Sequence, residues 1–242
     1  MKIRSALGSG STHWFEQILN EEQLKREREY QPEHQENNLK HFRPSMVHAC
    51  PRALWYARKG TEAAAIKPQS LRRMGIGTLL HEFIEDLVKS TSTYHSSEQE
   101  VVYDDGYIRM VGHYDLILVN PSGGYELVEL KSYADPAGRY KLNLPREEHI
   151  GQWNLYSFLT SVNDHVPDVD SGFIFYFNKN TQEYKIYQQK RNILRISNLL
   201  KKLNRVQDYL TMDKIYPYQP DENHNWCGFK SVCERDYFLK GI

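Results

Sequence analysis

Three charged residues, Asp115, Glu129 and Lys131, lie in a stretch of sequence that is otherwise typical of two β-strands joined by a turn. Burying a charged group in an apolar strand is unfavourable unless the group has a partner. Side chains alternate between the two faces of a strand, so Glu129 and Lys131 share a face. If the turn NPSGG is centred on Ser122, Asp115 lies seven residues before the centre and Glu129 seven after it. The two carboxylates then face each other across the ladder.

Two facing carboxylates repel each other, and the pKa of one rises unless a cation lies between them. Carboxylate and carbonyl oxygens are ligands that suit Mg²⁺ or Mn²⁺. An ion of this kind polarises a phosphoryl oxygen and lowers the pKa of its bound water. Lys131 is placed to orient that water or to stabilise charge on the phosphate. A surface ladder of salt bridges is the alternative, and these three residues alone favour neither interpretation.

The elements that position these residues follow from the hydrophobic pattern. Strands are predicted between residues 98 and 131, and a hairpin with NKNTQ as its turn is predicted over residues 171–189. Helices are predicted over residues 13–30, 45–60, 75–89, 145–162 and about 190–210. The pattern of residues 75–89 is the strongest, because Ile76, Leu80, Phe83 and Leu87 form one apolar stripe. This order predicts an α/β fold with a central mixed β-sheet flanked by helices.

Composition limits the class of protein. The 242 residues suit one large domain, or one domain with short appendages, and 40% of them are hydrophobic. Lys+Arg and Asp+Glu number 31 each, so the chain has no overall charge that attracts nucleic acid, and a polyanion would need local basic patches. No apolar run approaches a membrane span, and the first residues lack the apolar region of a signal peptide. We therefore expect an intracellular, cytoplasmic protein without membrane contact.

Four short motifs occur in the order and on the elements expected of one family. They are GTLLH with Gly77 and His81, GHYD with Gly112 and Asp115, ELK with Glu129 and Lys131, and QWNLY with Gln152 and Tyr156. With these motifs the chain resembles the PD-(D/E)xK nuclease superfamily. More narrowly, it is similar to the RecB-like exonuclease branch that includes the CRISPR-associated adaptation nucleases. The resemblance spans residues 45–233, so we expect an N-terminal helical leader over residues 1–44 and the nuclease domain over residues 45–242.

The resemblance implies a role for each matched residue. Asp115, Glu129, the backbone carbonyl of Leu130 and His81 would hold Mg²⁺ or Mn²⁺, and Lys131 would act as the base or stabilise charge. A packed core histidine is the alternative for His81. Gln152 and Tyr156 lie on one helix face, and the resemblance places that face against a DNA strand, whereas the alternative makes Tyr156 a core residue. Basic residues of the predicted helix 190–210 form either a solvated face or a phosphate-contacting one.

The three cysteines are odd in number, which argues against a disulfide framework. In the resembled branch, an upstream Cys joins a C-terminal Cys-x-x-Cys-x5-Cys in binding an iron–sulfur cluster. Here Cys50 stands upstream, and the C-terminal set reads His224, Cys227 and Cys233, with the spacing kept and the first cysteine replaced. The resemblance implies a [4Fe–4S] cluster, and the histidine makes Zn²⁺ the alternative. Three unrelated buried thiols are the other interpretation.

These patterns together predict a divalent-metal-dependent DNA exonuclease, with linear ends or single strands as its DNA partner. Within the same fold, an endonuclease or a nuclease that trims CRISPR spacers is the alternative. A non-catalytic DNA-binding subunit with a vestigial site is the alternative from another class. DNA repair, recombination, phage replication and CRISPR adaptation are all compatible with the motifs.

Overall fold

The computed structural model of the chain describes residues 17–26, 39–134, 144–219 and 224–240. Residues 17–26 are helical. The elements that follow are η1 (Pro44–Met46), α2 (Pro51–Arg58), α3 (Pro68–Lys89), β1 (Tyr94–Ser97), β2 (Glu100–Asp104), β3 (Arg109–His113), β4 (Leu116–Val119), β5 (Tyr125–Tyr133), α4 (Glu147–Ser161), β6 (Ser171–Asn178), β7 (Tyr184–Lys190), α5 (Ile193–Thr211), η3 (His224–Trp226) and α6 (Lys230–Lys240). The predicted α/β fold is confirmed.

The main sheet has five strands in the order β1-β4-β5-β6-β7. It is mixed, because β5 and β6 are parallel whereas the other neighbouring strands are antiparallel. The helix α4 makes the crossover between β5 and β6, as parallel neighbours require. The hairpin β6–β7 turns where the sequence predicts.

The predicted strand around GHYDLILV is interrupted, which corrects the expectation of one continuous strand. Its first half, β3, pairs with β2 in a separate two-stranded sheet, and its second half, β4, belongs to the main sheet. The interruption falls at Tyr114, whose ring is fully buried and whose hydroxyl lies 2.8 Å from Oγ of Ser96. Asp115 is therefore at the junction of the two sheets, immediately before β4.

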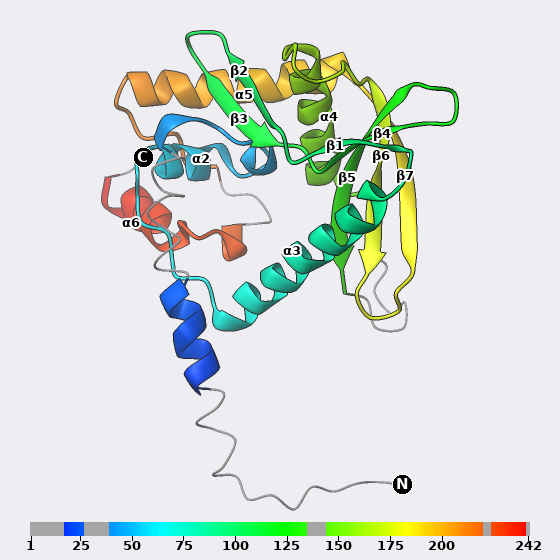
Figure 1. Cartoon of the computed structure of the whole chain (residues 1–242). Coiled ribbons are helices and arrows are strands. Elements are labelled where there is room, and N and C mark those ends of the chain that lie inside the picture. The colour runs from blue at the N-terminus through cyan, green and yellow to red at the C-terminus, as the bar shows by residue number, and fades with distance from the viewer. Residues whose placement is uncertain (1–16, 27–38, 135–143, 220–223, 241–242) are drawn as a thin grey trace, which may run out of the picture.

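Helices cover the two faces of the main sheet unequally (Figure 1). On one face, α4 packs on β5 and β6, and α5 packs on α4 and α2. The main core lies here, with Trp153 and Leu155 of α4, Leu127 of β5 and Leu203 of α5 all buried. On the other face, α3 crosses the sheet diagonally and packs on β5 and β1. A small apolar cluster under α3 contains Leu130.

The helix α3 begins seven residues before its predicted start, with Pro68 in its first turn. Its apolar stripe does not cover the sheet. Ile76, Phe83 and Leu87 are all more than half exposed, whereas Ile84 contacts the small cluster on β4 and β5. The residues that face the sheet are therefore on an adjacent flank of the helix.

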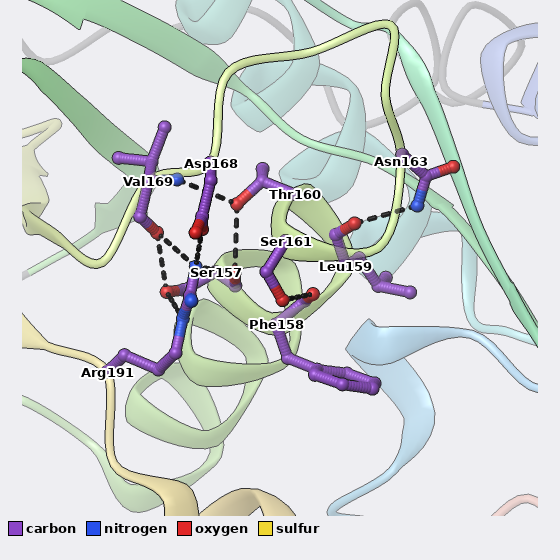
Figure 2. A network of polar contacts seen from close by, with 9 residues as sticks. All are labelled: Ser157, Phe158, Leu159, Thr160, Ser161, Asn163, Asp168, Val169 and Arg191. Carbon is purple, nitrogen blue, oxygen red and sulfur yellow. Dashed lines mark hydrogen bonds and ion pairs between the residues drawn. The ribbon is translucent and has the colours of Figure 1, made fainter.

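Arg191, immediately after β7, fixes the C-terminal half of α4 to the loop before β6 (Figure 2). Its Nε donates to Oγ of Ser157 at 2.8 Å, and its Nη2 donates to the carbonyl of Val169 at 2.9 Å and to the carboxylate of Asp168. The Ser157 hydroxyl also donates to the Val169 carbonyl at 2.7 Å. This network holds α4 against the loop that leads into β6.

The segment before α2 is joined to the core, and the C-terminal segment is hydrogen-bonded to the loop that follows α2. Phe42 is buried and exchanges backbone hydrogen bonds with β3, at 2.8 Å to the Arg109 carbonyl and 2.9 Å from the Val111 amide. The Ala64 amide donates to the Gly228 carbonyl at 2.8 Å. No helix in the described part of the chain is long and apolar enough to span a membrane.

Candidate active site

The predicted register between the two strands that carry the charges is confirmed. Leu116 pairs with Val128 in the β4–β5 ladder, so the next position along places Asp115 opposite Glu129. Oδ2 of Asp115 accepts a hydrogen bond of 2.6 Å from the backbone amide of Leu130. Nζ of Lys131 contacts Oε1 of Glu129 in a close ion pair, as expected for residues on one face of β5.

Burial sets the electrostatics of this group. Glu129 is only 2% exposed, and this burial, together with the Asp115 charge, raises the pKa of its carboxyl to about 8. Burial acts to lower the pKa of Lys131, but the Glu129 and Asp115 carboxylates outweigh it and hold that pKa above its usual value. Glu129 is costly to ionise because it is buried beside a second carboxylate, and a cation bound between the two would stabilise its ionised form.

His81 reaches the carboxylates from α3. Its Nδ1 lies 3.8 Å from Oδ1 of Asp115, and its side chain is 29% exposed. Burial lowers the pKa of His81, although the Asp115 carboxylate acts in the opposite direction. The imidazole is therefore neutral at neutral pH, which is the form that binds a metal ion.

Two carboxylates that the sequence reasoning missed also border this group. Glu85 lies one turn after His81 on α3, and it accepts a hydrogen bond from Oγ of Ser97 and pairs with Lys89 at 2.7 Å. Glu98 follows β1 with a φ of +50°, and burial and the charges of Asp115 and Glu85 raise the pKa of its carboxyl to about 7. The four-residue spacing from His81 would have indicated Glu85, whereas only the pairing of β1 with β4 brings Glu98 here.

Gln152 and Tyr156 of α4 lie near the carboxylates of Asp115 and Glu129. Tyr156 is buried within the main core, and Gln152 is hydrogen-bonded to it. Burial and the carboxylates Glu129 and Asp115 raise the pKa of the Tyr156 phenol well above its usual range. Gly112 is needed at this point, because a Cβ there would be 2.9 Å from the Tyr156 ring. The motif GHYD thus allows α4 to approach the strands closely.

The residues proposed for the second metal site come from both ends of the domain. Burial raises the pKa of the Cys233 thiol. The charge of Arg52 acts to lower this pKa, whereas Cys50 and Cys227 act to raise it. The three thiols therefore share one environment. The buried Nε2 of His224 lies 3.4 Å from Oε1 of Glu234 and forms no hydrogen bond within the described chain.

The side chains around Glu129 and those around Cys233 are of types that bind metals, but neither set is spaced closely enough to form a metal site. Among the described residues, no three His, Cys, Asp or Glu side chains form a group that could hold a metal ion. At the first place the donors are carboxylates and an imidazole, which fit a hard divalent cation. At the second they are thiols and an imidazole, which fit zinc or an iron–sulfur cluster.

Two basic residues of the long helix α5 contact other groups within the chain. Arg195 pairs with Glu147 at 2.6 Å, and Nζ of Lys202 donates to the carbonyls of Val47 and Ala49 at 2.6 Å each. These contacts favour a structural role for both side chains over contact with phosphates.

Comparison with known proteins supplies the family context. A model of the PD-(D/E)XK nuclease superfamily matches residues 14–234. No curated protein matches the sequence. The crystal structure of SSO0001 superposes with a TM-score of 0.60 at 18% identity, covering 92% of this chain and 97% of that one. LHK-Exo in complex with dAMP gives a TM-score of 0.52 at 15% identity, covering 75% and 93%. A second LHK-Exo structure, an alkaline exonuclease from Laribacter hongkongensis, gives 0.47 at 14%, covering 75% and 97%.

Proposed function

The chain belongs to the PD-(D/E)XK nuclease superfamily, and we propose that it is a divalent-metal-dependent DNA exonuclease that hydrolyses phosphodiester bonds. The observation that carries this proposal is the convergence of Asp115, Glu129 and Lys131 where β4 and β5 meet. A non-catalytic subunit would have no reason to keep a buried carboxylate whose pKa is raised to about 8. A binding role alone is therefore the less favoured alternative.

Asp115, Glu129, the Leu130 carbonyl and His81 would hold Mg²⁺ or Mn²⁺. When bound, such an ion polarises the scissile phosphate and lowers the pKa of a bound water. Lys131 is charged and nearly buried, and it orients the attacking water or stabilises charge that develops on the phosphate. Its ion pair with Glu129 fixes the position of its ammonium group.

Gln152 would contact the DNA strand beside the reacting phosphate, and Tyr156 would hold Gln152 in place from the core. This division of roles follows from their positions, because Tyr156 is 5% exposed whereas Gln152 is half-buried. The similarity of the fold to LHK-Exo in its complex with dAMP, a mononucleotide, supports attack on linear ends or single strands. An endonuclease of the same fold, or a nuclease acting in CRISPR adaptation, is the alternative.

The experiment is a cleavage assay on one plasmid in linear and covalently closed circular form, with Mg²⁺, Mn²⁺ or a chelator. We expect rapid loss of the linear form, slow loss of the circle and no reaction with the chelator. Cleavage should weaken as salt increases, because phosphate contacts release counterions. Equal rates on both forms would favour the endonuclease, and DNA binding without cleavage in either metal would favour the non-catalytic subunit.

At the second place, Cys50, His224, Cys227 and Cys233 would bind a [4Fe–4S] cluster, with Zn²⁺ as the alternative. The shared environment of the three thiols supports this proposal, as does the buried Nε2 of His224, which forms no hydrogen bond within the described part of the chain. Such a metal would have a structural role, because hydrolysis needs no redox step. It would also close a long loop between the two ends of the domain, which constrains the unfolded chain.

Anaerobic purification followed by metal analysis tests this site. A brown protein with about four irons per chain would support the cluster. A colourless protein with one zinc per chain would replace it by zinc. If neither metal is present and Cys227→Ser leaves the stability unchanged, the three cysteines are simply buried thiols.

A further inference from the structure

The imidazole of His149, in the first turn of α4, lies beside Lys131 and has no assigned role in the reaction. Tyr176 pairs with Lys131 in the parallel β5–β6 ladder, so their two side chains lie on the same face of the sheet. Tyr176 is 1% exposed, and its hydroxyl lies 2.7 Å from Nδ1 of His149 and accepts a hydrogen bond of 3.1 Å from the Arg146 amide. Tyr176 therefore holds the imidazole at the edge of the candidate active site.

The same contact determines which nitrogen of His149 carries the proton. A phenol has one hydrogen to donate, and among the described residues Nδ1 of His149 is the one acceptor within reach of the Tyr176 hydroxyl. Burial and the charges of Lys131 and Arg146 lower the pKa of His149 to about 3, so the ring is neutral. A neutral imidazole that accepts at Nδ1 carries its proton on Nε2. This Nε2–H donates to no group in the described part of the chain, so it can donate to a ligand.

The position of His149 along α4 differs from that of the carboxylates. Among charged groups, Lys131 has the largest influence on the pKa of His149. For Tyr156 on the same helix, the largest such influences are Glu129 and Asp115. His149 and Tyr156 are seven residues apart, which is about 10 Å along the helix axis. This distance exceeds the rise of about 3.4 Å per nucleotide along a DNA strand. If the reacting phosphate lies at the carboxylates, a neighbouring phosphate of that strand lies at the level of His149.

We propose that His149 is a further substrate-binding residue, whose Nε2–H donates a hydrogen bond to a phosphate oxygen next to the scissile phosphate of the bound DNA strand. This inference rests on the proposed nuclease function. His149 lies three residues before Gln152 on one face of α4, so the two polar side chains follow the strand together. Tyr176 is a positioning residue, because its hydroxyl fixes the orientation and the tautomer of the imidazole.

Two amide substitutions separate substrate binding from a packing role. The amide of asparagine reaches the place of Nδ1 and can still accept from Tyr176, whereas the amide of glutamine reaches the place of Nε2 and supplies a donor there. His149→Leu and His149→Asn should raise KM for a short linear DNA about ten- to a hundredfold, since a hydrogen bond to a charged group is lost. The value of kcat should change little, because the contacted phosphate does not react. His149→Gln should recover most of the loss in KM.

Two measurements on the full-length chain do not depend on cleavage. NMR of labelled imidazole nitrogens, with the His149 signals identified by their loss in His149→Gln, should show the proton on Nε2. DNA binding in a chelator should weaken by the same factor at every salt concentration in His149→Leu, because a neutral imidazole displaces no counterion. The matched control is His165→Leu, which should bind DNA like the wild type, since Nε2 of His165 contacts the Glu100 carbonyl on β2 at 2.9 Å.

Several results would overturn this role of His149 while leaving the nuclease in place. They are a proton on Nδ1, a wild-type KM in His149→Leu, and recovery by asparagine as complete as that by glutamine. A salt slope for His149→Leu that is smaller by about 0.7–0.9 would indicate a charged contact and would overturn the neutral donor. A wild type that neither binds nor cleaves DNA would overturn the proposed function, and the inference with it.

Discussion

Replacing Glu129 by glutamine should remove a loss of stability that the metal-free wild type suffers as the pH rises. Burial and the Asp115 charge raise the pKa of Glu129 in the folded protein from 4.5 to about 8. Between these values the unfolded chain releases a proton that the folded protein retains, so stability falls as the pH rises. The loss is complete above about pH 8 and disappears below about pH 4.5.

The magnitude follows from the same two values. A rise of roughly 3.5 at about 1.36 kcal/mol for each unit gives an upper limit of about 5 kcal/mol, of which about 4 kcal/mol develops between about pH 5 and pH 9. The amide removes this dependence, and below about pH 8 the Lys131 ammonium faces a neutral carboxyl group in the wild type just as it faces a neutral amide in the variant. The difference between variant and wild type should therefore rise by about 2–4 kcal/mol from pH 5 to pH 9, whatever its starting value.

Urea unfolding in the presence of a chelator measures this difference. Glu126→Gln is the matched control, because Glu126 lies on the same strand but on the opposite face. Mg²⁺ at pH 9 should stabilise the wild type and not Glu129→Gln. A Glu129→Gln difference that is the same at every pH would refute the electrostatic account of the site.

Two further predictions concern the scaffold. Arg191→Ala should lower the free energy of unfolding by about 2–4 kcal/mol, since it removes the donor of several buried hydrogen bonds. Asp168→Ala should lower it by under about 1 kcal/mol, because that carboxylate is 64% exposed. Urea unfolding of both variants measures these losses, and equal losses would contradict the prediction. Gly172→Ala should lower the free energy of unfolding by more than about 3 kcal/mol, because the φ of Gly172 is +154° and a Cβ would lie 2.0 Å from the Leu127 carbonyl oxygen. A thermal unfolding midpoint like that of the wild type would contradict the β5–β6 pairing.

The parts of this fold that the sequence predicts are those that local pattern determines. The register of Asp115 and Glu129 follows from the symmetry of the turn about Ser122, and the β6–β7 hairpin follows from alternation around NKNTQ. The start of α3 was predicted seven residues too late, although Pro68 is a typical first-turn residue that marks it.

Other features depend on contacts between distant segments. The break at Tyr114 arises because its hydroxyl reaches Ser96 and Gln99, and the alternating pattern carries no sign of these contacts. Glu98 belongs to the site only because β1 pairs with β4. The stripe of α3 was visible in the sequence, but a periodic pattern does not say whether an apolar face meets the chain's own sheet or another molecule.

The central claim is that Asp115, Glu129 and Lys131 form the centre of a metal-dependent nuclease. The most direct measurement is the rate of nucleotide release from linear DNA in Mg²⁺ or Mn²⁺ by the wild type and by Asp115→Ala, Glu129→Ala and Lys131→Ala, with each fold verified by circular dichroism. The account predicts metal-dependent release by the wild type and none by the folded variants. Release at the wild-type rate by purified Glu129→Ala would contradict the assignment of the active site.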